Sequence, residues 1–541
     1  MVWGTTTLGT VSTNCQLKVP GTITFDPSAP AQSHTATVQP EANFVSVANT
    51  TGVIANLTAL TTAPSRNVEW TVIDTKNQEW EFDKTIPVKL VEKSRLTLGA
   101  PITNPTPNAT LAETQMVGQQ PRLIGSGCTT LSSSNQRRAS LALGGNHTCV
   151  IDTKEQLWCW GYNNYGQLGI NSQTSSSTLK LVSSFNRPQQ VVAAGTYQTC
   201  AIDIDRQLSC WGYCANGQIG NVGSCTGSSC TTTNPNCRST PVNLTAVPNA
   251  VAVATGSSHT CAVNNSNQLF CWGSNNYRQL GNATLVTYSD YPNPQRVTAL
   301  SNVVAVAAGY YHTCAVTNSS GSGYVDCWGN NTSGQIGNST TNSPVTDPYR
   351  ISVLSGKAVA VAAGAGHTCA LNNEGRIWCW GNNAQGQIGN SVVSPTSTTY
   401  VLTLYEIPTS GLRNRAVAIA AGGYHTCALS DDGKVWCWGR NNEGQLGLGD
   451  NVTPRTSPSS IPYFNNNAAV AIAAGSNHTC AITENNELLC WGSNSNGQLG
   501  VSGVTTSHTP LPICISSGCL GTGITFSGVP VQKSTELQLG P

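Results

Sequence analysis

The chain has few charged residues. Asp, Glu, Lys and Arg make up only 9% of its 541 residues, compared with about a quarter in a typical globular protein. The 26 basic and 25 acidic residues give a net charge of +1, which produces no field to attract phosphate groups or anionic lipids. We therefore expect no nucleic-acid partner, and we expect neutral polar side chains to keep the protein in solution.

Long apolar runs and catalytic signatures are also missing. No stretch of about 18 apolar residues occurs, so we expect no membrane insertion. The first residues, Met1–Gly4, have neither the basic start nor the apolar segment of a signal peptide. No nucleophile elbow, P-loop, zinc-protease motif or dinucleotide fingerprint is found. The sequence therefore predicts a protein that is not an enzyme and that has no cofactor, no metal and no catalytic residues.

Cysteine, in contrast, is abundant. The chain contains 22 cysteines, and a reducing cytosol would keep so many thiols from forming disulfides. We therefore predict a disulfide-rich protein located outside the cell or at the cell surface.

One motif recurs seven times. It reads AAG-x-x-HTCA, then about eight residues, then CWG, then N-x-x-GQ(L/I)G, and its clearest copy spans residues 420–447. The first cysteines of successive copies are 51 to 61 residues apart, a period that suits one four-stranded blade. The sequence predicts an all-β fold, a seven-bladed β-propeller over residues 139–500.

Each copy also predicts a disulfide across a hairpin. In the sixth copy, a turn centred on Asp432 places Leu429 opposite Val435 and Cys427 opposite Cys437. Directly opposed residues lie close enough for a disulfide. The predicted pairs are Cys149–Cys159, Cys200–Cys210, Cys261–Cys271, Cys314–Cys327, Cys369–Cys379, Cys427–Cys437 and Cys480–Cys490.

Tryptophan and histidine recur with the motif. Because side chains alternate along a strand, the CWG tryptophans point away from the cysteines, and we expect them to pack between blades. Six histidines occupy the HTC position, where the second copy has Gln198, so we expect hydrogen bonds to backbone within each blade instead of a metal ring. These residues are Trp160, Trp211, Trp272, Trp328, Trp380, Trp438 and Trp491, and His147, His259, His312, His367, His425 and His478.

Eight cysteines remain. Cys514 and Cys519 are predicted to close a small loop, and elimination leaves Cys15 to pair with Cys128. An insertion after the second CWG contains Cys214, Cys225, Cys230 and Cys237. Their spacing lacks paired zinc knuckles, so we favour two disulfides over a zinc site, with three connectivities possible.

The repeat closely resembles that of the regulator of chromosome condensation family, in the wording AAG-x-x-HT-x-AL, V-x-x-WG-x-N-x-x-GQLG over about residues 139–500. The resemblance implies the seven-bladed propeller. That scaffold serves a nucleotide exchange factor for a small GTPase, a secreted β-lactamase inhibitor and many extracellular proteins. The paired cysteines in every blade depart from the intracellular members, so an exchange-factor role is not expected.

The two ends lie outside the repeats. Residues 1–112 read as short strands with intervening Pro, Gly and Thr, and predict a β-sandwich-like domain with a linker, followed by a connecting segment at 113–138. Residues 501–541 contain two strand-like pieces, GITFSGVPV and STELQLG. These are predicted either to close the ring or to add a strand to a neighbouring molecule.

Two functions remain open at this point. The first is an extracellular structural or adhesive protein, as a subunit of a surface filament assembled by inter-subunit strand pairing; its partners are other copies of itself or a surface protein or glycan. The second is a secreted monomeric protein-binding module, with Tyr162, Tyr165, Tyr213 and Tyr277 as exposed aromatic anchors.

Sequons permit glycosylation in either case. They occur at Asn49, Asn56, Asn108, Asn146, Asn243, Asn264, Asn282, Asn318, Asn330, Asn331, Asn338, Asn451 and Asn477.

Overall fold

The computed structural model describes residues 141–513, except 153, 221–236, 320–321, 352–353, 355–357, 392–399, 409–414 and 486, together with the backbone of fourteen short strands before residue 125. The chain divides into two compact units that meet in sequence at residues 136 and 137. No helix in the described part of the chain is long and apolar enough to cross a membrane.

The N-terminal unit is built of antiparallel strand pairs. Its largest sheet has the order β14-β2-β5-β4. Strand β13 pairs with β3, and β14 pairs with β2. The segment predicted as a connection at 113–138 therefore contributes strands to this unit. The sandwich itself stays a prediction. The strands are β1 (Thr6–Leu8), β2 (Cys15–Pro20), β3 (Thr22–Ile23), β4 (Thr37–Gln39), β5 (Phe44–Asn49), β6 (Ile54–Leu57), β7 (Arg66–Val68), β8 (Trp70–Ile73), β9 (Glu79–Glu81), β10 (Ile86–Val88), β11 (Thr97–Leu98), β12 (Ala109–Ala112), β13 (Met116–Val117) and β14 (Arg122–Ile124).

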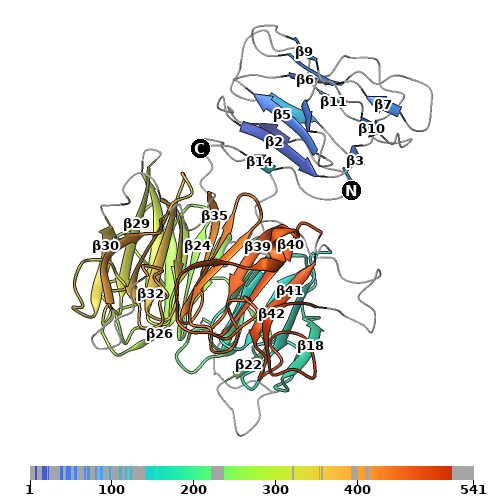
Figure 1. Cartoon of the computed structure of the whole chain (residues 1–541). Coiled ribbons are helices and arrows are strands. Elements are labelled where there is room, and N and C mark those ends of the chain that lie inside the picture. Colours follow the sequence, from blue (N-terminus) through green and yellow to red (C-terminus); the bar gives the residue numbers. More distant parts are fainter. Residues whose placement is uncertain are drawn as a thin grey trace. The chain divides into compact units, whose positions relative to one another are not determined.

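The second unit is the predicted seven-bladed propeller (Figure 1). Each blade is a four-stranded antiparallel sheet whose strands follow one another in sequence. The first three blades are β15 (Leu141–Leu143), β16 (His147–Ile151), β17 (Leu157–Gly161) and β18 (Ser176–Leu181); β19 (Gln189–Ala194), β20 (Gln198–Asp203), β21 (Leu208–Tyr213) and β22 (Cys237–Leu244); and β23 (Ala250–Thr255), β24 (His259–Asn264), β25 (Leu269–Ser274) and β26 (Asp290–Arg296).

The other four blades repeat this order, and the sixth is followed by the short 3-10 helix η2 (Pro462–Asn465). They are β27 (Val303–Ala308), β28 (His312–Ser319), β29 (Ser322–Gly329) and β30 (Val345–Ile351); β31 (Ala358–Ala363), β32 (His367–Asn372), β33 (Ile377–Asn382) and β34 (Tyr400–Glu406); β35 (Ala416–Ala421), β36 (His425–Ser430), β37 (Val435–Gly439) and β38 (Arg455–Ser460); and β39 (Ala469–Ala474), β40 (His478–Thr483), β41 (Leu488–Ser493) and β42 (Thr506–Pro512).

The hairpin register agrees with the sequence prediction. Cys427 lies opposite Cys437 and Leu429 opposite Val435. All seven predicted hairpin disulfides are present, and the Cα atoms of each pair are 4.1 Å apart. The disulfides therefore staple the second and third strands of every blade.

The seven glycines that end the innermost strands crowd together around the ring axis. A Cβ atom built on Gly364 would lie 2.2 Å from Cε1 of His367 and 2.5 Å from the carbonyl oxygen of Gly422 in the next blade. Because no side chain fits between a blade's own imidazole and its neighbour's backbone, the motif requires glycine here. The equivalent residues are Gly144, Gly195, Gly256, Gly309, Gly364, Gly422 and Gly475.

The motif histidines join neighbouring blades, which corrects the expectation of backbone hydrogen bonds within one blade. The imidazole Nε2 of His147 lies 2.9 Å from Oγ1 of Thr199 in the next blade. That hydroxyl donates in turn to the carbonyl oxygen of Gln167 at 2.8 Å. All six histidines make this contact, and Gln198 instead donates to backbone oxygens of the third blade, at Gly256 and His259.

The CWG tryptophans pack between blades, as predicted. All seven are fully buried, and six donate from Nε1 to the glutamine carbonyl of the preceding blade's GQ(L/I)G sequence. Trp160 of the first blade donates in this way to Gln498 of the seventh.

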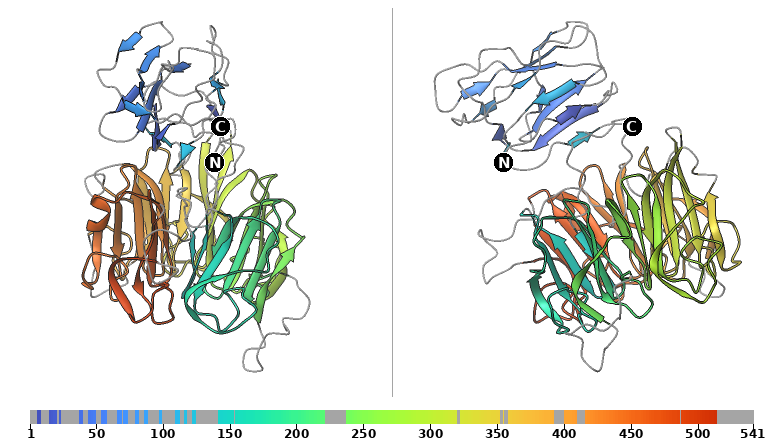
Figure 2. Two further views of the ribbon diagram at one scale, coloured as in Figure 1. Left: turned by 90° about the vertical axis from the view of Figure 1, so that its right-hand side faces the viewer. Right: turned by 180° about the vertical axis from the view of Figure 1, so that it is seen from behind.

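The last blade lies beside the first (Figure 2) and is joined to it by the same histidine–threonine and tryptophan–glutamine contacts that join most other neighbouring blades. Nε2 of His478 lies 2.9 Å from Oγ1 of Thr148. Strand β42 is the outer strand of the seventh blade and lies within the segment at 501–541 that was predicted to close the ring or to be exchanged. The ring closes without the strand-like pieces that follow Ile513, because every blade already has its four strands.

Candidate functional site

Two sets of loops emerge at the same end of the propeller. Since the strands of a blade alternate in direction, the turn after the first strand and the loop after the third lie at one end. We call this end the loop face. It carries the two variable residues of AAG-x-x-H and the residues that follow each CWG.

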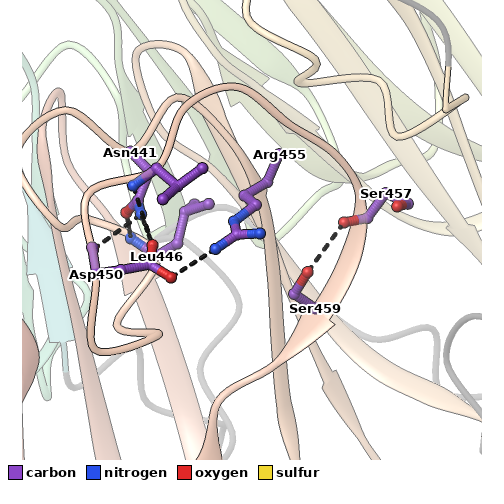
Figure 3. A network of polar contacts seen from close by, with 7 residues as sticks. Asn441, Leu446, Asp450, Arg455, Ser457 and Ser459 are labelled. Carbon is purple, nitrogen blue, oxygen red and sulfur yellow. Dashed lines mark hydrogen bonds and ion pairs between the residues drawn. The ribbon is translucent and has the colours of Figure 1, made fainter.

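Buried asparagines hold the loops of this face. In the sixth blade, Asn441 accepts a hydrogen bond from the backbone of Leu446 through Oδ1 and donates through Nδ2 to Asp450, whose carboxylate also pairs with Arg455 (Figure 3). Nearby, Ser459 donates to the carbonyl oxygen of Ser457. The same Oδ1 contact is made by Asn163, Asn275, Asn331, Asn383 and Asn494 in their own blades.

The second blade has Cys214 where the first has Asn163 in the motif. Cys214 and Cys237 are both disulfide-bonded, and Cys237 pairs with Tyr213 in the strand register. A covalent link therefore replaces the asparagine in this loop. Cys225 and Cys230 lie outside the described residues, so their pairing stays a prediction.

Four tyrosines of the first two blades meet on the loop face. Tyr165 is central, with its ring centroid 4.8 Å from that of Tyr213 and 5.1 Å from that of Tyr197. The centroid of Tyr162 lies 6.3 Å from that of Tyr165 and 6.1 Å from that of Tyr197. All four rings are partly exposed, and we call them the tyrosine patch. The structure thus brings together three residues selected from the sequence.

More tyrosines continue along the loop face. Tyr277, the fourth residue selected from the sequence, stacks with Tyr311 of the fourth blade at 4.9 Å between centroids. Tyr310 reaches across the ring, where its hydroxyl lies 2.8 Å from Oγ of Ser476 in the seventh blade. Tyr424 is also exposed.

Sequence reasoning missed Tyr197, Tyr310, Tyr311 and Tyr424. All four occupy the variable positions between AAG and HT, or directly beside them. Tyr197, Tyr311 and Tyr424 share the second of these positions, so the signal was a tyrosine bias at that position, in copies far apart in the chain.

Two tyrosines of the patch have pKa values above the ordinary one for a phenol. Burial, followed by the neighbouring phenols Tyr165 and Tyr197, raises the pKa of Tyr162 above its ordinary value. Burial also raises the pKa of Tyr213, with smaller contributions from Tyr165 and the carboxylate of Asp290. The rings therefore offer flat apolar surface edged by hydroxyl donors and acceptors.

The ring axis is too narrow to be a ligand site. The void lined by the glycine ring, Tyr310 and Ser476 measures about 30 Å³, which holds water but no organic molecule. Among the described residues, no group of three or more His, Cys, Asp or Glu side chains is placed to bind a metal.

Three of the possible glycosylation sites have buried side chains. Asn264, Asn330 and Asn331 are 5%, 7% and 0% exposed, and Nδ2 of Asn331 donates to the carbonyl oxygens of Thr340 and Asn342. A glycan has no room at such positions. Asn243 and Asn451 are exposed, and with Asn146, Asn282, Asn318, Asn338 and Asn477 they stay predictions. The side chains of Asn49, Asn56 and Asn108, like the predicted pairs Cys15–Cys128 and Cys514–Cys519, lie outside the described residues.

Comparison with solved structures identifies the fold independently. A crystal structure of yeast RCC1 (Prp20) bound to Kap60 matches with a TM-score of 0.60 and 21% identity, over 74% of this chain and 91% of that one. Human WBSCR16 matches with a TM-score of 0.58 and 22% identity, over 66% of this chain and 94% of that one.

Comparison of sequences identifies the family. The ultraviolet-B receptor UVR8 of Arabidopsis thaliana is 28% identical over 67% of this chain and 78% of its own length. The mitochondrial RCC1 domain-containing protein RUG3 of the same plant is 30% identical, over 48% of this chain and 57% of its own length. Models of the regulator of chromosome condensation (RCC1) repeat match residues 139–167 and 154–202. The RCC1-like domain model matches residues 222–526, more than half of the chain, and the chain therefore belongs to the RCC1-like domain family.

Proposed function

We propose that this propeller is an extracellular protein-binding module, and that the tyrosine patch forms part of its binding surface. The observation that carries the proposal is the clustering of Tyr162, Tyr165, Tyr197 and Tyr213 from two blades into one partly exposed group. Tyrosine is enriched in binding surfaces because it offers a large contact area at a small cost in conformational entropy.

The surrounding residues support a protein as the partner. The loops read GYNNYGQLG, GTYQT, GYCANG and GSNNYRQLG, a mixture of Tyr, Ser, Gly and Asn that resembles antibody binding loops. Buried asparagines hold two of these loops in place before binding, which lowers the entropy lost on association. Protein binding is also reported for the yeast propeller of the same fold.

The compartment is part of the proposal. A disulfide in each of seven blades supports folding in an oxidising environment. Alkylating the native protein taken from its source cells, under denaturing but non-reducing conditions, should label none of the fourteen hairpin cysteines. Labelling of these cysteines would contradict an extracellular location.

The filament hypothesis has weaker support. The ring is complete with β42, so the later strand-like pieces are not needed for closure. They lie outside the described residues, and strand exchange between copies stays a prediction. Sizing of the native protein separates the two functions, because a strict monomer is expected for the binding module.

Site-specific photo-crosslinking tests the binding surface. A photoreactive phenylalanine analogue replaces Tyr165 in one sample and Tyr349 in a matched control, since Tyr349 is an exposed tyrosine of the outer strand β30. Extracellular proteins of the source organism serve as the probe. We expect one protein to be crosslinked from position 165 and not from 349, and its affinity to fall at least about tenfold in Tyr165→Ser. Equal crosslinking from both positions would contradict the proposal.

A further inference from the structure

The loop between β25 and β26 in the third blade presents two unusually exposed apolar side chains. Tyr288 is 81% exposed and Val286 is 65% exposed, the two highest values among the large apolar residues that the structure describes. The rings of the tyrosine patch are only partly exposed. Burying a side chain as large as tyrosine on a partner removes a large apolar area from water.

The backbone of Tyr288 is strained. Its φ angle is 62°, and it is the one aromatic residue among the non-glycine positions of positive φ in the described chain. A bulky residue is disfavoured in this left-handed region because its Cβ approaches the backbone. Such strain concentrates at functional sites, and a buried contact of the ring does not explain it here.

The rest of the loop is held firmly. The phenol of Tyr291 accepts a hydrogen bond from the backbone of Val286 at 2.7 Å. Asn275 donates from Nδ2 to the carbonyl oxygen of Val286 at 3.1 Å and from its backbone to Ser289 at 3.1 Å. These bonds hold the backbone on either side of Tyr288, which reduces the entropy lost on binding.

The loop lies next to the tyrosine patch. Asp290, two residues after Tyr288, accepts a hydrogen bond from Nδ2 of Asn216 at 3.3 Å, and its charge acts on Tyr213. The loop carries one cation, Arg278, which donates to the carbonyl oxygen of Leu285, and it ends at the exposed carboxylate of Asp290. It therefore has no excess positive charge to attract phosphate groups or anionic lipids. This balance favours a protein over a membrane as the partner of the two apolar side chains.

We infer that Tyr288, assisted by Val286, is an anchor residue that enters an apolar pocket on a folded protein partner. This inference rests on the proposed function, because the anchor stands at the border of the tyrosine patch. The partner supplies the concave side of the interface, and the propeller supplies the protruding ring.

Titration of the protein captured from position 165 tests the anchor. We expect Tyr288→Ser to weaken binding at least about 30-fold, while Tyr288→Phe stays within about threefold because the ring remains. Tyr349→Ser serves as the matched control, and wild-type affinity is expected. If Tyr165→Ser weakens binding and Tyr288→Ser does not, the anchor is overturned and the proposed function stands. If no protein is captured from position 165, both are overturned.

Two further measurements exclude other roles for the residue. Glycine tolerates the left-handed backbone, so Tyr288→Gly should lose binding while its unfolding midpoint is unchanged or higher; a lower midpoint would make Tyr288 a structural residue. Sedimentation with vesicles of phosphatidylcholine and phosphatidylserine should recover no protein. Recovery that depends on Tyr288 would assign the loop to membranes and overturn the inference.

Discussion

Lowering the pH should destabilise the propeller through its buried histidines. Replacing one of these histidines should reduce the pH dependence of the free energy of unfolding by a predictable amount. The hydroxyl of Thr199 has one hydrogen, which it donates to the carbonyl oxygen of Gln167. The oxygen of this hydroxyl must therefore accept from His147 at 2.9 Å. His147 is fixed as the tautomer that carries its proton on Nε2.

The other ring nitrogen has no place for a second proton. Nδ1 is buried without a hydrogen-bond partner in His147, His259 and His478. Burial lowers the pKa of each of these three residues from 6.5 to about 3. No carboxylate contributes to these shifts, and in His478 the neighbouring imidazoles of His147 and His425 add to the effect of burial.

The sign of the pH dependence follows from these values. Between pH 6.5 and 3 the unfolded chain binds a proton at each of the three histidines and the folded chain does not. Stability is therefore complete above the unfolded pKa and is lost as the pH falls. Each histidine contributes a slope of about 1.4 kcal/mol per pH unit, so the three together contribute about 4 kcal/mol per pH unit near pH 5.

The variant His147→Gln measures the contribution of one histidine to the pH dependence of stability. Gln198 already occupies the equivalent position in the second blade and bonds to the third, so glutamine fits the site. Urea unfolding with intact disulfides, followed by tryptophan fluorescence between pH 5.5 and 4.5, should give a slope lower by about 1.4 kcal/mol per pH unit in the variant. All carboxylates are common to both proteins and cancel in the difference. Equal slopes would refute the assignment of a neutral, proton-free Nδ1.

Other substitutions test the packing of the ring. Gly364→Ala should lower the free energy of unfolding by at least about 2 kcal/mol, because its Cβ would meet backbone and imidazole. In the control Gly366→Ala, the nearest contact of the new Cβ would be 3.4 Å away, so the free energy of unfolding should change by less than about 0.5 kcal/mol. Similar losses in the two variants, measured by chemical denaturation, would contradict the crowding at Gly364. Replacing Cys427 and Cys437 together by alanine should cost about 2.8 kcal/mol at 25 °C, as the chain-entropy model gives for so short a loop; an unchanged thermal midpoint would show that this disulfide adds nothing. Asn441→Ala should cost about 2–3 kcal/mol, because the backbone of its loop loses a buried partner, and faster hydrogen exchange confined to that loop is the expected signature.

Much of the blade could be predicted from sequence because its information is local. The register of Cys427 with Cys437 follows from the two-residue period of a strand and one glycine turn. The outer strands were harder to place: β42 reads TSHTPLP and β38 reads RTSPSS, without the alternation that marks a half-buried strand. For this reason the sequence did not mark β42 as the fourth strand of the last blade.

Contacts between blades could not be predicted, since they depend on how the sheets stack. The sequence marks His147 and Thr199 as motif residues but does not say that one reaches the other across a junction. The tyrosine patch was missed in part for the same reason. Tyr197 reaches Tyr165 only because adjacent blades bring their loops to one face.

The junction between the seventh and first blades bears on how propellers gain or lose blades during evolution. Each blade is one uninterrupted stretch of chain, and the junction of His478 with Thr148 has the same histidine–threonine contact as five of the other six junctions. Duplicating or deleting a single stretch of gene would therefore add or remove a whole blade without breaking a sheet. The crowded glycines bear on such events, because a blade gained or lost would change the spacing of the backbones that now meet at these residues.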